Sequence, residues 1–238
     1  MKRASALFSG AIVTSALLLA SPAVAEEAAI DARLKSAGWS LFENADWKPA
    51  RFALTQDGAI HVTTEDSTAL IWREVAPGAK ARRYLSWRWR VDAAMPPTDI
   101  TVKGGDDRPL AVHVWFEDPP ERQSFFAAIR AAVLEGLFGI PVSGRVLTYV
   151  WGGTGKPGDA QRNPHIGEDS WMIVRRVQGA APGAERGRWV EERVDLAADF
   201  QRGFGEAPPP ARIIAIAADS EDTHTASTAF VRDIRFHD

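Results

Sequence analysis

Cysteine is absent from the 238 residues of the sequence. This absence excludes disulfides, thiolate metal sites, a cysteine nucleophile and a lipid-modified cysteine anchor, and any metal would need oxygen or imidazole ligands. A strong excess of one charge is also lacking, because 28 Lys and Arg residues face 31 Asp and Glu residues. That balance argues against a nucleic-acid partner. Tyrosine is scarce, at 2 residues against 9 Trp and 11 Phe, so the aromatic side chains are mainly apolar.

Long apolar runs are confined to the N-terminal region. Lys2 and Arg3 precede a largely apolar stretch at 4–20, and Ala23-Val24-Ala25 matches a signal-peptidase site. We expect a secretory signal of 25 residues, followed by one soluble domain over 26–238 in the bacterial periplasm or outside the cell. An uncleaved anchor is the alternative, but a spanning helix needs about 20 apolar residues. No second run of spanning length follows, so we expect no integral membrane segment after signal cleavage.

The rest of the chain shows apolar and polar residues in alternation, which is typical of strands. The clearest case is 84–91, where Trp87 and Trp89 belong to the apolar set. An Asp57-Gly58 turn predicts a hairpin between two further alternating runs. Many short strands with few helices predict a mostly β protein, an antiparallel β-sandwich. Further strands are expected at 52–54, 60–62, 69–75, 110–117, 146–151, 171–177, 188–194, 213–218 and 228–236.

Two segments depart from this alternation. Residues 121–138 place apolar side chains at helical spacing between Pro119-Pro120 and Gly139, which predicts one inserted amphipathic helix. The helix would cover an edge of the sandwich or act as a lid over a ligand groove. The second segment, 152–165, is rich in Gly and Pro but lacks the spacing of a phosphate-binding loop, so we interpret it as a surface loop.

A series of motifs along the chain is similar to a known family. The chain resembles the domain of unknown function family 3047, which implies a secreted bacterial protein without assigned activity. The resemblance also implies a jelly-roll sandwich like that of carbohydrate-binding modules. Where the family tends to have Asp-x-Asp-x-Thr, this chain has the second acid one place later, in 219–223. The motifs that carry the resemblance lie at 87–91, 103–107, 147–151, 187–193, 199–206, 218–223 and 229–236.

Two acidic groups stand at the ends of predicted strands. Asp106 and Asp107 precede one strand, while Asp219 and Asp222 follow another together with Glu221. One hypothesis is that Asp106, Asp107, Asp219 and Asp222 converge on calcium, which takes six to eight oxygen ligands. Turn chemistry is the alternative for the first pair, because Asp bonds its own backbone and Gly adopts positive φ. Polar recognition or catalysis is a third interpretation.

Aromatic and charged residues occur together on the predicted strands. Flat aromatic faces beside hydrogen-bonding groups suit sugar rings, and a bidentate Arg can hold a carboxylate. The alternative is that this is an ordinary outer sheet face, covered by a second apolar layer such as the inserted helix. If strand faces are shared across the sheet, the ligand-binding residues are Arg88, Arg90, His113, Trp115, Tyr149 and Trp151.

Signs of catalysis are few. The five histidines show no close metal-ligand spacing, and no Gly-x-Ser-x-Gly elbow is present. Glu191 and Glu192 point to opposite faces of a strand, so they cannot form the carboxylate pair of a glycosidase. We therefore expect a non-catalytic protein that binds a glycan or similar polar ligand. A polysaccharide hydrolase or lyase is one alternative, and a structural envelope protein whose inserted helix docks a protein partner is another.

Overall fold

The computed structural model of the protein describes residues 28–43, 46–93, 95–117, 144–177 and 186–238. The predicted signal and the helix expected at 121–138 lie outside these residues, as does the protein-docking role considered for that helix. None of the helices in the described ranges is long and apolar enough to cross a membrane.

Within those ranges the chain folds into twelve strands, two short α-helices and one 3₁₀ turn. In chain order they are α1 (Ala32–Ser36), β1 (Ser40–Glu43), β2 (Arg51–Leu54), β3 (Ile60–Glu65), β4 (Thr68–Glu74), η1 (Pro77–Ala79), β5 (Tyr84–Ala93), β6 (Arg108–Phe116), β7 (Val146–Trp151), β8 (Ala160–Asn163), β9 (Gly167–Arg176), β10 (Val190–Asp195), α3 (Leu196–Phe204), β11 (Ala211–Asp219) and β12 (Ala226–His237).

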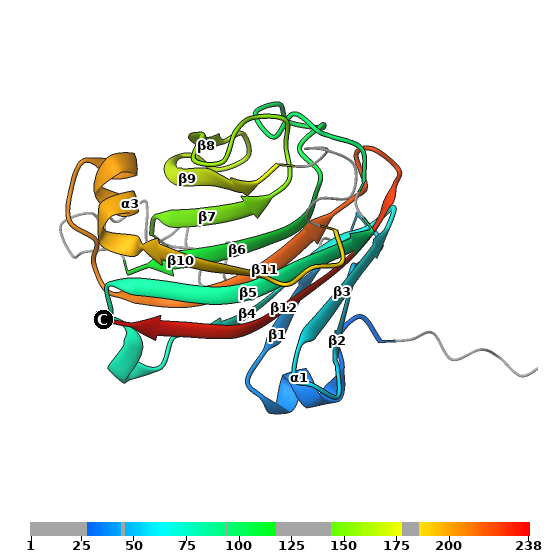
Figure 1. The fold of residues 1–238 in the computed structure, drawn as a ribbon, viewed down its shortest axis with the longest axis horizontal. Helices are drawn as coiled ribbons and strands as arrows, with labels where there is room; N and C mark the ends of the chain where they lie inside the picture. Colours follow the sequence, from blue (N-terminus) through cyan, green and yellow to red (C-terminus); the bar gives the residue numbers. More distant parts are fainter. Residues whose placement is uncertain (1–27, 44–45, 94, 118–143, 178–185) are drawn as a thin grey trace, which may run out of the picture.

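The strands form two sheets that pack face to face, seen as two layers in Figure 1. One has seven strands in the order β1-β4-β11-β6-β7-β9-β8, and the other has five in the order β10-β5-β12-β3-β2. The mostly β, two-sheet expectation is confirmed. Among the paired strands of the two sheets in the described ranges, only β7 and β9 run parallel to each other. The alternation of residues within a single strand does not show the direction of its partner.

Strand β5 supplies the centre of the core. Its side chains alternate between buried and half-buried from Tyr84 to Val91, as the sequence predicts, and the indoles of Trp87 and Trp89 point between the sheets. Trp87 meets Tyr149 of β7 with ring centroids 5.4 Å apart, and Trp89 meets Trp151 at the same distance. These ring contacts across the two layers, with others like them, hold the sandwich together.

Strands β6 and β7 are buried on both faces. Every position of each strand is buried, so neither shows a clean division into an inner and an outer face. On the outer side of the seven-stranded sheet, Trp115 joins Val146 and Ile213 in a second apolar cluster. The same outer side also carries polar residues, and these form the site described below.

Helix α3 closes one end of the sandwich, where it contacts β5, β9 and β10. Asp195 caps its first turn by accepting from the Ala198 N–H at 3.1 Å, and Gly205 ends it with a positive φ of 77°. Gly203 lies so close to Trp171 that an added Cβ would stand 2.6 Å from the indole Cγ. The few-helices expectation overlooked this element, although both capping residues are visible in the sequence.

The turn and loop expectations met different outcomes. The hairpin through Asp57 and Gly58 is present, with β2 and β3 paired in antiparallel register. The segment 152–165 is only partly a loop, because β8 forms within it and pairs with β9. Interpreting that whole segment as a surface loop was wrong. The Gly and Pro residues of the segment belong mainly to the turn before β8, and they led to the short strand being missed.

Candidate functional site

The six predicted ligand-binding residues lie on three different surfaces. Arg88 and Arg90 point outward from the five-stranded sheet, because the alternating Trp87 and Trp89 point into the core. His113 and Trp115 lie on the outer side of the seven-stranded sheet, whereas Tyr149 and Trp151 lie in the core between the sheets. The prediction of one shared face was therefore wrong. The six residues come from strands of both sheets. In addition, Tyr149 and Trp151 of β7 point into the core, whereas the prediction assumed that they point outward.

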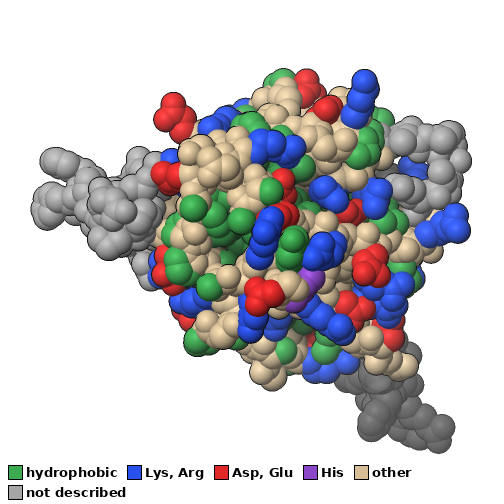
Figure 2. Space-filling view, turned by 60° about the vertical axis from the view of Figure 1, so that its left-hand side comes forward, with side chains coloured by type: hydrophobic (Ala, Val, Ile, Leu, Met, Phe, Trp, Pro, Cys, Tyr) green, Lys and Arg blue, Asp and Glu red, His purple; other side chains and the backbone are tan. Residues whose placement is uncertain are grey.

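Arg90 of β5 is already engaged by its neighbours. The Arg90 guanidinium lies 4.2 Å from the centroid of Phe230 and 5.1 Å from that of Trp189, and it pairs with Asp92 at 2.7 Å. Arg88 lines a small cavity of about 130 Å³ on the same sheet. At the end of the sandwich turned forward in Figure 2, Lys and Arg side chains alternate with Asp and Glu without forming a field of one sign.

Tyr149 and Trp151 have structural roles in the core. The Tyr149 hydroxyl donates to Asp199 Oδ2 of α3 at 3.1 Å. Burial and the neighbouring Asp199 charge hold the pKa of Tyr149 well above its ordinary value. Neither ring lies on an outer sheet face, because both pack in the core between the two sheets.

His113 and Trp115 remain as candidates on the outer side. Their rings stack with centroids 5.2 Å apart and an interplanar angle of 28°. His113 Nδ1 lies 3.0 Å from the Thr148 hydroxyl, but Nε2 has no hydrogen-bond partner among the described residues. Burial, assisted by the charge of Arg108, lowers the pKa of His113 to about 3. The ring is therefore neutral at physiological pH, with one polar nitrogen unsatisfied.

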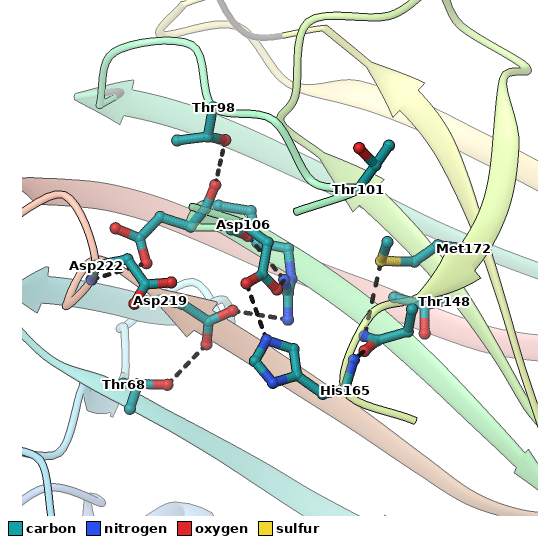
Figure 3. A network of polar contacts seen from close by, with 12 residues as sticks. Thr68, Thr98, Thr101, Asp106, Thr148, His165, Met172, Asp219 and Asp222 are labelled. Atoms are coloured by element: carbon teal, nitrogen blue, oxygen red, sulfur yellow. Dashed lines mark hydrogen bonds and ion pairs between the residues drawn. The ribbon is translucent and has the colours of Figure 1, made fainter. Parts of the chain in front are cut away.

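The two acidic groups meet at the adjacent ends of β6 and β11. Buried Arg108 joins them, with Nη1 3.2 Å from Asp106 Oδ2 and Nη2 2.7 Å from Asp219 Oδ2. His165 Nε2, from the turn between β8 and β9, lies 2.9 Å from the other oxygen of Asp106. Figure 3 shows Asp106, Asp219, Asp222 and His165 gathered around this point, with Thr68 donating to Asp219. Four segments that are distant in sequence thus build one polar cluster.

Asp107 holds the turn between β11 and β12. Its Oδ2 accepts from both the backbone N–H and the hydroxyl of Thr223, at 2.8 Å and 2.6 Å. Such bonding of an Asp side chain to backbone N–H is typical of turns. Here, however, it links the segment before β6 to the turn between β11 and β12, and does not close the turn that contains Asp107. The carboxyls of Glu221 and Asp222 are thereby held beside those of Asp106 and Asp219.

Burial and mutual repulsion shift the pKa values of these acids upward. Burial raises the pKa of Asp219, against the opposing charge of Arg108. Burial together with the charge of Asp219 raises the pKa of Glu221 to about 8, and burial with the charge of Asp107 raises the pKa of Asp222. At neutral pH Glu221 therefore carries a proton.

A cleft of about 300 Å³ brings the acidic cluster and the aromatic pair together. That volume lies at the lower end of the range for small-molecule sites, roughly 300–1,000 Å³. The described residues that line it are Phe42, Thr68, Ala69, Leu70, Asp106, Asp107, Arg108, His113, Trp115, Asn163, His165, Ile166, Ala217, Asp219, Glu221 and Asp222.

Comparison with protein families matches residues 38–235 to DUF3047, a family described as a protein of unknown function. The chain belongs to DUF3047. No curated protein matches it. The resemblance drawn from the motifs is confirmed, and the DUF3047 match contains all the residues that line the cleft.

Calcium is not favoured by the arrangement in this DUF3047 chain. In the described ranges, no group of three or more His, Asp or Glu side chains is placed to hold a metal ion. The guanidinium of Arg108 takes the position between Asp106 and Asp219 where a cation would stand. Calcium binding stays a prediction, and it requires that calcium raise the unfolding temperature above its value in EDTA.

Among the cleft residues that were not predicted as site residues are Arg108, Asn163 and His165. Arg108 directly follows Asp106 and Asp107 in the sequence, so its proximity to them could have been predicted. Asn163 and His165 reach the cleft through β8, in the segment interpreted as a loop; His165 is 59 positions from the Asp106 that it contacts. No local pattern in the sequence connects those two positions.

Proposed function

We propose that this protein is a binding protein of the periplasm or the extracellular space, and that its outer cleft holds a glycan or similar hydroxyl-rich ligand. The observation that carries this proposal is the free Nε2 of His113. The residue is 95 % buried, yet this nitrogen has no partner among the described residues and its side chain lines the cleft. Buried polar atoms are nearly always hydrogen-bonded, so a ligand hydroxyl is the natural partner for it.

The remaining walls of the cleft suit a sugar. Trp115 and Leu70 offer apolar surface for the C–H faces of a ring, while Asn163 and the carboxylates offer acceptors for hydroxyls. Arg108 and protonated Glu221 add donors. A two-sheet sandwich of jelly-roll type, as in carbohydrate-binding modules, is the finer fold assignment that belongs to this proposal.

Isothermal titration with a panel of neutral and charged oligosaccharides tests the proposal. We expect at least one sugar to bind, and Trp115→Ala and His113→Ala each to weaken its binding by tenfold or more. Trp189→Ala is the matched control, because Trp189 packs against Arg90 and Phe230 of the other sheet; it is expected to leave affinity unchanged. Absence of binding by every sugar, or equal loss in the control, overturns the proposal. Thermal unfolding of each variant separates lost binding from lost folding.

Glycan hydrolysis or cleavage by a lyase is a second candidate, favoured by one observation. Glu221 retains its proton at neutral pH, with a pKa of about 8, beside the carboxyl of Asp222. A protonated acid next to an ionised one is the arrangement that glycosidases use. Release of new reducing or unsaturated ends from a bound sugar, abolished by Glu221→Gln, would establish turnover. Binding without product assigns the cleft to recognition alone.

A further inference from the structure

The wall of the cleft carries more negative charge than the protein itself neutralises. Five carboxyls line it, from Asp106, Asp107, Asp219, Glu221 and Asp222, while Arg108 is the one Arg or Lys in the described lining. Like charges gathered in a partly buried site repel each other unless a cation enters.

The available cation is already committed to two of these groups. Arg108 pairs with Asp106 and Asp219, and the His165 ring contacts Asp106. Asp107 is satisfied by the N–H and hydroxyl of Thr223. Glu221 and Asp222 form no salt bridge with any Lys or Arg in the described part of the chain. Asp222 is therefore the carboxyl of the wall that no described Lys or Arg side chain neutralises, and Glu221 beside it is held in the protonated form at neutral pH.

A second observation points to a ligand in the same cleft. The unsatisfied Nε2 of His113 belongs to a nine-tenths buried ring that lines the cleft. The ring is neutral, so it provides a hydrogen-bonding position without any positive charge. The cleft thus combines a polar position on the sheet face with an acidic wall at the turn between β11 and β12.

We propose that the cleft selects an amine-bearing glycan, an amino sugar whose nitrogen is free and protonated, with its ammonium group against Asp222 and beside the Glu221 carboxyl. This inference rests on the proposed function and names its ligand class. A hydroxyl of the same sugar meets His113 Nε2, and the ring lies along Trp115. An N-acylated nitrogen has no charge and loses the attraction. A uronic acid meets repulsion from the same carboxyls.

Titration calorimetry at pH 6, where the sugar amine is protonated, tests the selection. The probes are a glucosamine oligomer, the matching N-acetylglucosamine oligomer, a neutral glucose oligomer and spermidine. We expect the glucosamine oligomer to bind at least about tenfold tighter than the other two sugars, as for hydrogen bonds to charged groups. Its affinity falls as salt is raised, because ion pairs at a partly open site are screened.

Variants locate the ammonium. Asp222→Asn and Glu221→Gln keep side-chain shape and replace each acid by an amide that cannot ionise; we expect the double variant to bind the glucosamine oligomer no better than the N-acetyl one. Asp233→Asn is the matched control, since it removes the same charge on the other sheet and Asn tolerates the positive φ of 57° there. It is expected to retain the preference.

The outcomes separate the two proposals. Equal affinity for the glucosamine and N-acetylglucosamine oligomers overturns the amine selection and leaves glycan binding in place. Binding of spermidine with no sugar bound overturns both, as does the absence of binding by all four probes. If the double variant fails to fold, the salt dependence and the N-acetyl comparison on the unchanged protein still decide the matter.

Discussion

Arg108 Nη2 lies 2.7 Å from Asp219 Oδ2, across paired positions of β6 and β11. Both side chains are nearly buried, and the same guanidinium also contacts Asp106. A buried ion pair of this kind gives little net stability by itself, but loss of one partner leaves a buried charge uncompensated. The pair therefore couples the stability of the sheet to the charge balance of the cleft.

Replacement of this arginine is expected to destabilise the fold strongly. Arg108→Met removes the guanidinium that Asp106 and Asp219 share, and we expect the free energy of unfolding in urea to fall by about 3–5 kcal/mol. Adding Asp219→Asn should recover part of that loss, because the two changes share one interaction. Simple additivity of the two changes would contradict the coupling. Lys48→Met, which removes an exposed pair with Glu65, is the control and should change little.

The lowered pKa of His113 predicts that the protein loses stability in acid. Its pKa is about 3 in the folded protein against 6.5 ordinarily, so the unfolded chain takes up a proton first as the pH falls. The free energy of unfolding that depends on neutral His113 is fully present above pH 6.5. It declines as the pH falls toward 3, by up to about 1.4 kcal/mol per pH unit.

The His113→Gln variant isolates that contribution. Urea unfolding of both proteins at pH 7, 6, 5 and 4 should show a steeper decline for the wild type. The raised pKa values of Asp219 and Asp222 act in the opposite direction in both proteins, so they largely cancel in the difference. Parallel curves would show that the ring is not buried in neutral form.

Gly203→Ala is expected to reverse the usual helix preference. Alanine normally stabilises a helix interior relative to glycine by up to about 1 kcal/mol. Here the new Cβ meets the Trp171 side chain at 2.6–2.9 Å, so we expect a net destabilisation of about 1–3 kcal/mol by overpacking. Gly78→Ala, with no atom within 4 Å of the new Cβ, should stay close to wild type. Thermal and urea unfolding measure both, and a stabilised Gly203→Ala protein would contradict the contact.

The predicted secretory signal has a direct chemical readout. Expression of the full sequence in a Gram-negative host should yield a periplasmic or secreted protein that begins at Glu26. N-terminal sequencing is expected to read Glu-Glu-Ala-Ala-Ile. A purified protein that retains residues 1–25 would contradict cleavage and favour the anchor.

Strands with one half-exposed face could be predicted well from the sequence. In β5 the half-exposed residues alternate with buried indoles, and this alone orients Trp87 and Trp89 correctly. The same logic fails for Tyr149 and Trp151, because β7 is buried throughout. With apolar neighbours on both sides, no polar residue marks which face is inner.

The candidate site was only partly accessible to sequence reasoning. Acids at strand ends indicated where loops gather, and these acids do line one cleft. What they contact depends on strand order, because β11 lies between β4 and β6. His165 reaches Asp106 because it follows β8. His113 lines the same cleft because it lies on the outer side of β6. Such relations arise from long-range pairing, which local patterns do not encode.

The position of the last two strands governs when this protein can fold. β11 and β12 lie in the middle of their sheets, and the Thr64–Ser227 and Thr68–Asp219 hydrogen bonds each close a span of 163 and 151 positions. Such distant contacts slow folding, because chain entropy is lost before the contacts form. A chain still under synthesis lacks the centre of both layers. Folding therefore waits for the final strands, and until then β3 and β4 each present an open edge to other molecules.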